Sequence, residues 1–162
     1  MRQALELACS AGAAGEIPVG AVLVHCDSNG EWAVVSKAGN LKESTQDPLG
    51  HAELIAIRRA AATLGRWRLS NCELYVTLEP CAMCAGAIVH ARLNRIIYGA
   101  TDAKAGAVES LYRILSDSRL NHAPEITSGT LATECAEVLS TFFKRLRMRA
   151  DVRSERKTSA PP

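Results

Sequence analysis

Two short stretches of the sequence decide the fold, and they read His51-Ala52-Glu53 and Pro80-Cys81-Ala82-Met83-Cys84. Imidazole nitrogen and thiolate sulfur are ligands that zinc prefers, and three protein ligands leave the fourth tetrahedral position open for a water. We therefore expect His51, Cys81 and Cys84 to hold one Zn²⁺ per chain, in a site of the catalytic rather than the structural kind.

The spacing of these residues predicts where two helices begin. His51 and Glu53 would diverge by about 200° within a helix body, so they can share a site only in a first turn. Pro48 and Gly50 place a helix start just before His51, and Pro80 suits a first helical position. Two helix N-termini would then meet at one metal and favour thiolate ligands there.

A carboxylate beside a metal site that does not itself bind the metal can move protons between the attacking water and a leaving group. Glu53 is our candidate for this catalytic role, although a first-turn acid can also simply complement the helix dipole. Glu79 is the rival acid, and its place before Pro80 suits an orienting role. His90 could be a fourth ligand, but on a helix it lies about 180° from Cys81 and faces away.

The pattern along the chain predicts an α/β fold with an antiparallel opening followed by alternating strands and helices. The first two strands are joined by a hairpin turn at Asp27-Ser28-Asn29-Gly30. We expect strands over 17–26, 32–36, 73–77, 95–99 and 125–127. We expect helices over 2–14, 51–64, 80–90, 111–115 and 130–149. Residues 1–149 then form one domain, and the polar tail 150–162 is expected to be disordered.

Composition excludes several classes of protein. Of 162 residues, 48% are hydrophobic and 22% charged, which is typical of a globular chain. No apolar run approaches the roughly 20 residues needed to span a membrane, and no secretory signal is evident, so we expect a cytoplasmic protein. In a reducing compartment Cys9, Cys26, Cys72 and Cys135 are expected to be buried as small apolar residues.

The net charge is only +2, yet residues 144–157 carry seven basic and two acidic side chains. Such a segment is either a solvated helix end, whose cations suit the helix dipole, or a surface that binds a polyanion. The charge alone leaves both interpretations open.

The HAE and PCxxC pattern resembles the cytidine/deoxycytidylate deaminase superfamily. Within it, the segments 17–22, 47–48, 75–87 and 98–107, and the tail from 121 through 143, resemble bacterial tRNA-specific adenosine deaminases. The resemblance implies a three-layer cytidine-deaminase-like fold, with a central mixed sheet of about five strands and helices on both faces. It also implies hydrolytic deamination of the wobble adenosine of a tRNA anticodon to inosine, through a zinc-activated water, by a homodimer that grips the anticodon stem-loop.

The same resemblance implies a set of substrate-binding residues. They are Asn40 and the backbone of Ala52 at the nucleoside, Asp102 and Lys104 near the RNA, and Phe142, Phe143, Lys144 and Arg145 on the C-terminal helix. Other roles remain open, since Asp102 could fix its own loop and one of the two phenylalanines could belong to the core. Leu49-Gly50 and Glu109 depart from the family pattern.

Two alternative functions remain open at this stage. A deaminase of free guanine or cytosine would use the same zinc site but has no use for a basic C-terminal helix. A catalytically inactive RNA-binding protein would have no need of Glu53.

Overall fold

The computed structural model describes residues 1–158, with side chains up to residue 149. Its five strands form one mixed sheet in the order β2-β1-β3-β4-β5. The strands are β1 (Gly20–Cys26), β2 (Trp32–Gly39), β3 (Cys72–Leu78), β4 (Arg95–Ala100) and β5 (Glu125–Thr127). β1 runs antiparallel to both β2 and β3, whereas β3, β4 and β5 are parallel. The predicted antiparallel opening and parallel continuation are confirmed.

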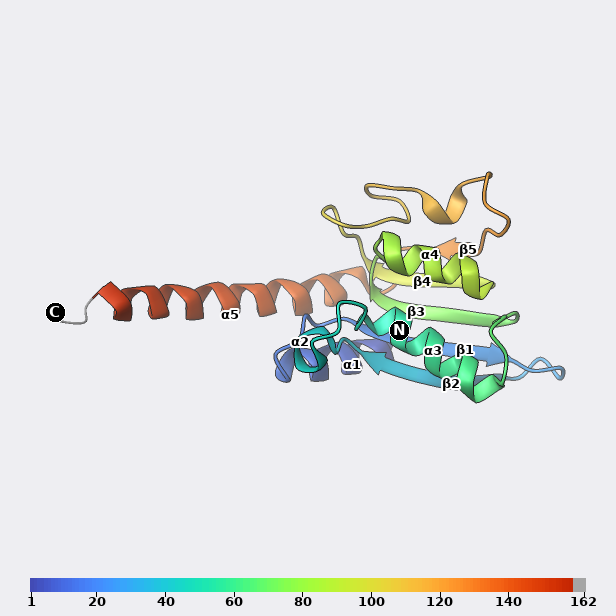
Figure 1. Ribbon diagram of the computed structural model, residues 1–162, viewed down its shortest axis with the longest axis horizontal. Coiled ribbons are helices and arrows are strands. Elements are labelled where there is room, and N and C mark those ends of the chain that lie inside the picture. Colours follow the sequence, from blue (N-terminus) through green and yellow to red (C-terminus); the bar gives the residue numbers. More distant parts are fainter. Residues whose placement is uncertain (159–162) are drawn as a thin grey trace.

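Helices cover both faces of this sheet, so the predicted three-layer fold is confirmed (Figure 1). α3 and α4 pack on one face, and α1 and α5 on the other. The helices are α1 (Arg2–Ala13), α2 (Lys42–Thr45), α3 (Ala52–Leu64), α4 (Ala82–Ala91) and α5 (Ala132–Thr158). None of the helices in residues 1–158 is long and apolar enough to cross a membrane.

Small residues bring α1 close to the sheet. A Cβ atom built on Gly20 of β1 would lie 2.0 Å from the backbone oxygen of Ala4, so only glycine permits this approach. Ala4 and Ala8 form the fully buried side of the helix. Cys9 is consequently exposed, which corrects the prediction that it is buried.

The other three cysteines outside the metal motif differ in burial. Cys72 of β3 and Cys135 of α5 are buried as predicted, but Cys26 at the end of β1 is only partly buried. All six cysteines are free thiols.

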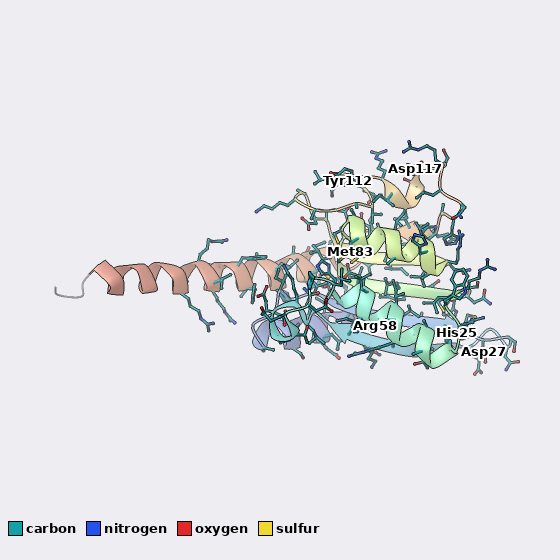
Figure 2. All side chains as sticks on the ribbon, viewed as in Figure 1. His25, Asp27, Arg58, Met83, Tyr112 and Asp117 are labelled. Atoms are coloured by element: carbon teal, nitrogen blue, oxygen red, sulfur yellow. The ribbon has the colours of Figure 1, made fainter. Side chains whose placement is uncertain are left out.

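The hairpin between β1 and β2 is confirmed, with Gly30 in the left-handed region at φ 83°. The carboxylate of Asp27 accepts the N–H groups of Asn29 and Glu31 and so closes the turn. The turn projects from the sheet end opposite α5, where Figure 2 labels Asp27.

Two predicted elements differ in the structure. The helix expected over 111–115 is a single 3₁₀ turn, η1 (Ile114–Ser116), because the N–H groups of Leu111 and Tyr112 both donate to the carbonyl of Gly106. The last helix does not end near Arg149 but continues to Thr158 and projects from the body (Figure 1). Residues 150–158 are therefore helical where disorder was expected, since Ala, Arg, Glu and Lys there favour helix. Residues 159–162 lie outside the described part of the chain.

Candidate metal centre and substrate site

His51 and Cys81 occupy equivalent positions at the starts of α3 and α4. Each is the N-cap residue of its helix, with backbone angles of φ −78°, ψ 141° for His51 and φ −72°, ψ 173° for Cys81. An N-cap residue is not yet helical, so its side chain can turn across the helix end. Cys84 follows in the first turn of α4, close to Met83, which Figure 2 labels at the start of that helix.

The ligand atoms of these three residues lie within 4.8 Å of one another. Nδ1 of His51 is 3.7 Å from Sγ of Cys81 and 3.5 Å from Sγ of Cys84. Tetrahedral zinc with bonds of about 2.05 Å to nitrogen and 2.3 Å to sulfur requires nitrogen–sulfur separations of about 3.6 Å. The two nitrogen–sulfur separations therefore match those of a zinc site.

The metal group has three members, which is the number typical of catalytic zinc sites. It is the one cluster of at least three His, Cys, Asp or Glu side chains with metal-ligand spacing in the described residues. His90 is exposed on the last turn of α4 and lies outside it, as its helical position predicts.

The two thiols titrate as a pair. A hydrogen bond from Cys84 is the largest influence on Cys81 and, together with the contact to His51, lowers the pKa of Cys81 to about 4. The same sulfur–sulfur contact and burial raise the pKa of Cys84. One thiolate is thus already favoured at neutral pH, as expected of a donor set made for a cation.

Glu53 is buried in the first turn of α3, beside the metal group but not part of it. Burial raises the pKa of Glu53, while its own backbone N–H and the nearby His51 oppose the rise. Its carboxyl lies next to the Cys84 thiol. A buried acid with a raised pKa, adjacent to a metal site, is suited to accept a proton and release it again during a reaction.

Asn40, at the end of β2, is buried against the start of α3. Its Oδ1 accepts the backbone N–H of Ala52 at 2.9 Å, which satisfies one of the unpaired donors at the helix N-terminus. Ala52 itself is fully buried. Among the described residues none accepts a hydrogen bond from the Asn40 amide nitrogen, so this donor is available to a ligand.

Glu79 has an environment opposite to that of Glu53. Burial alone would raise the pKa of Glu79, but hydrogen bonds from Ser110, Glu109 and Asp102 outweigh burial and lower the pKa to about 2. A carboxylate so firmly ionised and fully occupied by donors is poorly suited to shuttle protons. The geometry therefore favours Glu53 over Glu79 for that role.

The two loop residues expected near the RNA differ in their surroundings. Asp102 is half-buried, and its Oδ1 accepts the N–H groups of Lys104 and Ala105 at 2.9 and 3.2 Å. Asp102 therefore fixes its own loop, the alternative that the sequence left open. Lys104 is exposed.

The four residues expected on the C-terminal helix lie where α5 leaves the body. Phe142 is half-buried near Gly12 of α1, and Phe143 is 38% exposed and meets the Phe142 ring edge to face. Lys144 and Arg145 are exposed. Phe142 is thus partly covered by α1, and Phe143 is accessible.

Sequence reasoning missed Glu16, a carboxylate that is almost completely buried. It accepts the N–H groups of Glu43 and Ser44, at 3.0 and 2.7 Å, and so anchors the segment between Asn40 and His51. Glu16 is the one charged residue between Ala11 and Val24, so a lone acid in an apolar stretch was its only local signal, and that signal does not name its partners. The departures from the family pattern also have contacts, since Gly50 packs on the backbone of Lys42 and Glu109 accepts the Tyr98 hydroxyl.

A mixed five-stranded sheet with one histidine and two cysteines at helix N-termini, and a glutamate beside them, defines the zinc-dependent nucleobase deaminases as a class. Comparison with known proteins narrows the class. The MafB19-like deaminase family model matches residues 1–147. The tRNA-specific adenosine deaminase of Haemophilus influenzae is 51% identical over 147 residues, covering 91% of this chain and 83% of the relative.

Among solved structures, the chain is likewise more similar to one from a study of tRNA:A34 deaminases than to a guanine deaminase. A structure from a study of A-to-I editing by tRNA:A34 deaminases at the wobble position of transfer RNA has a TM-score of 0.79 and 47% identity, covering 86% of this chain and 97% of that one. Guanine deaminase from Bacillus subtilis has a TM-score of 0.57 and 33% identity, with 90% of each chain covered. The chain therefore belongs to the tRNA-specific adenosine deaminases, within the MafB19-like deaminase family.

Proposed function

We propose that this protein catalyses the hydrolytic deamination of the wobble adenosine of a tRNA anticodon to inosine. The observation that carries the proposal is the group of His51, Cys81 and Cys84, with the buried carboxyl of Glu53 beside it. The similarity to a tRNA:A34 deaminase structure supports adenosine in tRNA over a free base.

In this proposal His51, Cys81 and Cys84 hold one Zn²⁺ per chain. When bound, zinc supplies a water molecule that is activated for attack at neutral pH. Glu53 takes one proton from the water that attacks C6 of adenine and delivers it to N1. It then takes the remaining proton from the new C6 hydroxyl and passes it to the departing amino group. Adenosine and water thus become inosine and ammonia, and the carboxylate returns to its starting state.

Asn40 and Ala52 set the orientation of the purine. The amide oxygen of Asn40 holds the backbone of Ala52 in place, which leaves the amide nitrogen to donate a hydrogen bond to the nucleoside. Because this donor is fixed on the first turn of α3, it holds the base at a constant distance from Glu53.

The RNA partner is an anticodon stem-loop, in which the bases are already unstacked and cost little to extrude into a pocket. Lys104, Lys144 and Arg145 are exposed cations that can contact phosphates, and the accessible ring of Phe143 can stack on a base. Asp102 contributes by shaping the loop that carries Lys104.

We further propose that residues 1–149 form the catalytic domain of a homodimer that acts in the cytoplasm, where tRNA is. Leu111 and Tyr112 support an interface, because they are 53% and 59% exposed in the segment that follows β4. Figure 2 places Tyr112 on this segment. Light scattering should give twice the monomer mass, and a monomer at working concentration would contradict the dimer.

A substrate panel tests the activity. The purified protein should convert adenosine in an anticodon stem-loop to inosine, detected by mass spectrometry of the digested RNA. A matched stem-loop with guanosine at the target position should be unreactive, and so should free adenosine and cytidine. Faster turnover of free guanine or cytosine than of the stem-loop would replace the tRNA assignment with a small-molecule deaminase. RNA binding without turnover of any of these substrates would indicate an inactive RNA-binding protein.

A further inference from the structure

The carboxylate of Glu79 gathers five hydrogen bonds from one segment of the chain. Glu79 follows the last residue of β3 and is only 2% exposed. Its Oε1 accepts the N–H groups of Val108, Glu109 and Ser110 at 3.1, 2.8 and 2.9 Å. Its Oε2 accepts the N–H of Asp102 at 2.9 Å and the hydroxyl of Ser110. We call residues 102–110 the clamped loop.

No cation shares this carboxylate within the described residues, because the ion pairs there involve other acids. The charge is instead balanced by the backbone N–H groups that converge on it, as at a helix N-terminus. Every one of the five partners is a donor. An amide in place of the carboxylate would turn its own NH₂ toward donors and break contacts on one side.

The clamped loop is also fastened to the turn that carries the metal ligands. The N–H of Ala107 donates to the carbonyl of Pro80 at 2.8 Å, and Gly106 forms an isolated antiparallel bridge with Cys81. A Cβ atom on Gly106 would lie 2.4 Å from the Glu79 carboxyl, so glycine is required for the loop to dock. The loop, the carboxylate and the Cys81 turn therefore form one rigid unit.

We infer that Glu79 is a positioning residue that sets the RNA-binding loop at a fixed distance from the metal centre. It acts through Asp102, whose N–H it holds and whose side chain in turn fixes Lys104. This inference rests on the proposed function only in that the loop contacts RNA. The geometry of the clamp stands independently of the substrate.

Glu79→Gln is the direct test, and Glu73→Gln is its matched control. Glu73 lies on β3, the strand that Glu79 directly follows, and receives the same chemical change, but its partners are Tyr75 and Arg95, away from the clamped loop. We expect Glu79→Gln to raise KM for the stem-loop about tenfold while kcat changes less than about threefold, a loss of about 1.4 kcal/mol in binding. Glu73→Gln should leave both constants near the wild-type values.

A merely structural role would lower the fraction of active protein, so kcat would fall and KM would stay constant. That result would overturn the inference. Loss of zinc from Glu79→Gln would also overturn it, because Glu79 would then act on the ligand turn rather than on the loop. Should Glu79→Gln fail to fold, Ser110→Ala serves as the second variant. It removes the hydroxyl that donates to Glu79 and should raise KM. Ser110→Thr keeps the hydroxyl and should restore KM.

Amide hydrogen exchange on the full-length protein separates failure of this inference from failure of the proposed function. The amides of Asp102, Glu109 and Ser110 should exchange at least about tenfold faster in Glu79→Gln than in wild type, with or without RNA activity. Unchanged exchange would refute the clamp. If the wild type is inactive on the stem-loop but the amides still exchange faster in Glu79→Gln, only the proposed substrate is refuted and the inference about Glu79 stands.

Discussion

Oδ1 of Asn40 and the backbone N–H of Ala52 are joined by a buried hydrogen bond of 2.9 Å. The bond ties the end of β2 to the first turn of α3, between His51 and Glu53. In the proposed function this side chain has two roles, since its oxygen caps a helix and its amide nitrogen donates to the substrate. The two roles can be separated by mutation.

Asn40→Ala should lower the free energy of unfolding by about 1 kcal/mol, because it removes the acceptor for the Ala52 N–H. Asn40→Asp keeps an acceptor oxygen at a helix N-terminus, so its stability in urea should stay closer to that of wild type. Both variants should lose kcat/KM, since neither has an amide N–H to donate. An Asn40→Asp enzyme with full activity would show that the amide nitrogen does not contact the nucleoside.

Cys84→Ala should lose both zinc and activity, because two ligands cannot hold the ion in the site. The control is Cys72→Ala, which alters a buried cysteine of β3 outside the metal group. Elemental analysis should give one zinc per chain for the control and close to none for Cys84→Ala. Stoichiometric zinc in Cys84→Ala would reject the ligand assignment.

Glu53→Gln should keep its zinc yet lose turnover by at least about 10²–10⁴, the contribution of a typical acid–base group. The reason is that Glu53 lies beside the ligands rather than among them. Glu31→Gln in the exposed hairpin provides a control for the same change of charge. Single-turnover measurements on both variants, with zinc quantified in parallel, test the assignment, and near-normal turnover in Glu53→Gln would refute it.

Lys144→Ala combined with Arg145→Ala should weaken RNA binding and flatten its salt dependence. Each phosphate contact contributes roughly 0.7–0.9 to the logarithmic salt slope, so losing two should reduce the slope by about 1.4–1.8. Arg66→Ala with Arg68→Ala removes equal charge from the exposed connection between α3 and β3, at the opposite end of α3 from His51. If the two pairs of mutations have the same effect in a titration with the stem-loop, the basic segment where α5 leaves the body is only a solvated surface.

Glu16 should make stability depend on pH. Burial alone would raise the pKa of Glu16, but the hydrogen bonds from Glu43 and Ser44 outweigh burial and lower it. A lowered folded-state pKa gives stability that is present above the unfolded value near 4.3 and is lost as the pH falls through the folded value. Urea unfolding of Glu16→Gln should therefore show a smaller loss between pH 6 and about pH 3 than wild type. Equal losses would show that Glu16 is not the responsible carboxylate.

The sequence alone predicted the layers of the fold and the residues of the metal group. His51, Cys81 and Cys84 could be read from their chemistry, and the nearby helix starts from Pro48, Gly50 and Pro80. Pro80, however, lies just before the N-cap Cys81 and not at the first helical position that was expected. Both signals are local, because ligand preference belongs to the residue type and a helix start depends on a few neighbouring residues. The alternation of strands and helices predicted the parallel half of the sheet for the same reason.

The tertiary structure alone decided the roles of Glu16 and Glu79. Their hydrogen bonds join segments far apart in the sequence, and such contacts leave no periodic pattern in the residues themselves. The exposure of Cys9 likewise depends on the close approach of α1 to Gly20, which sets the buried side of the helix. A buried carboxylate is stable only where enough donors converge on it, and that convergence exists only once the chain has folded.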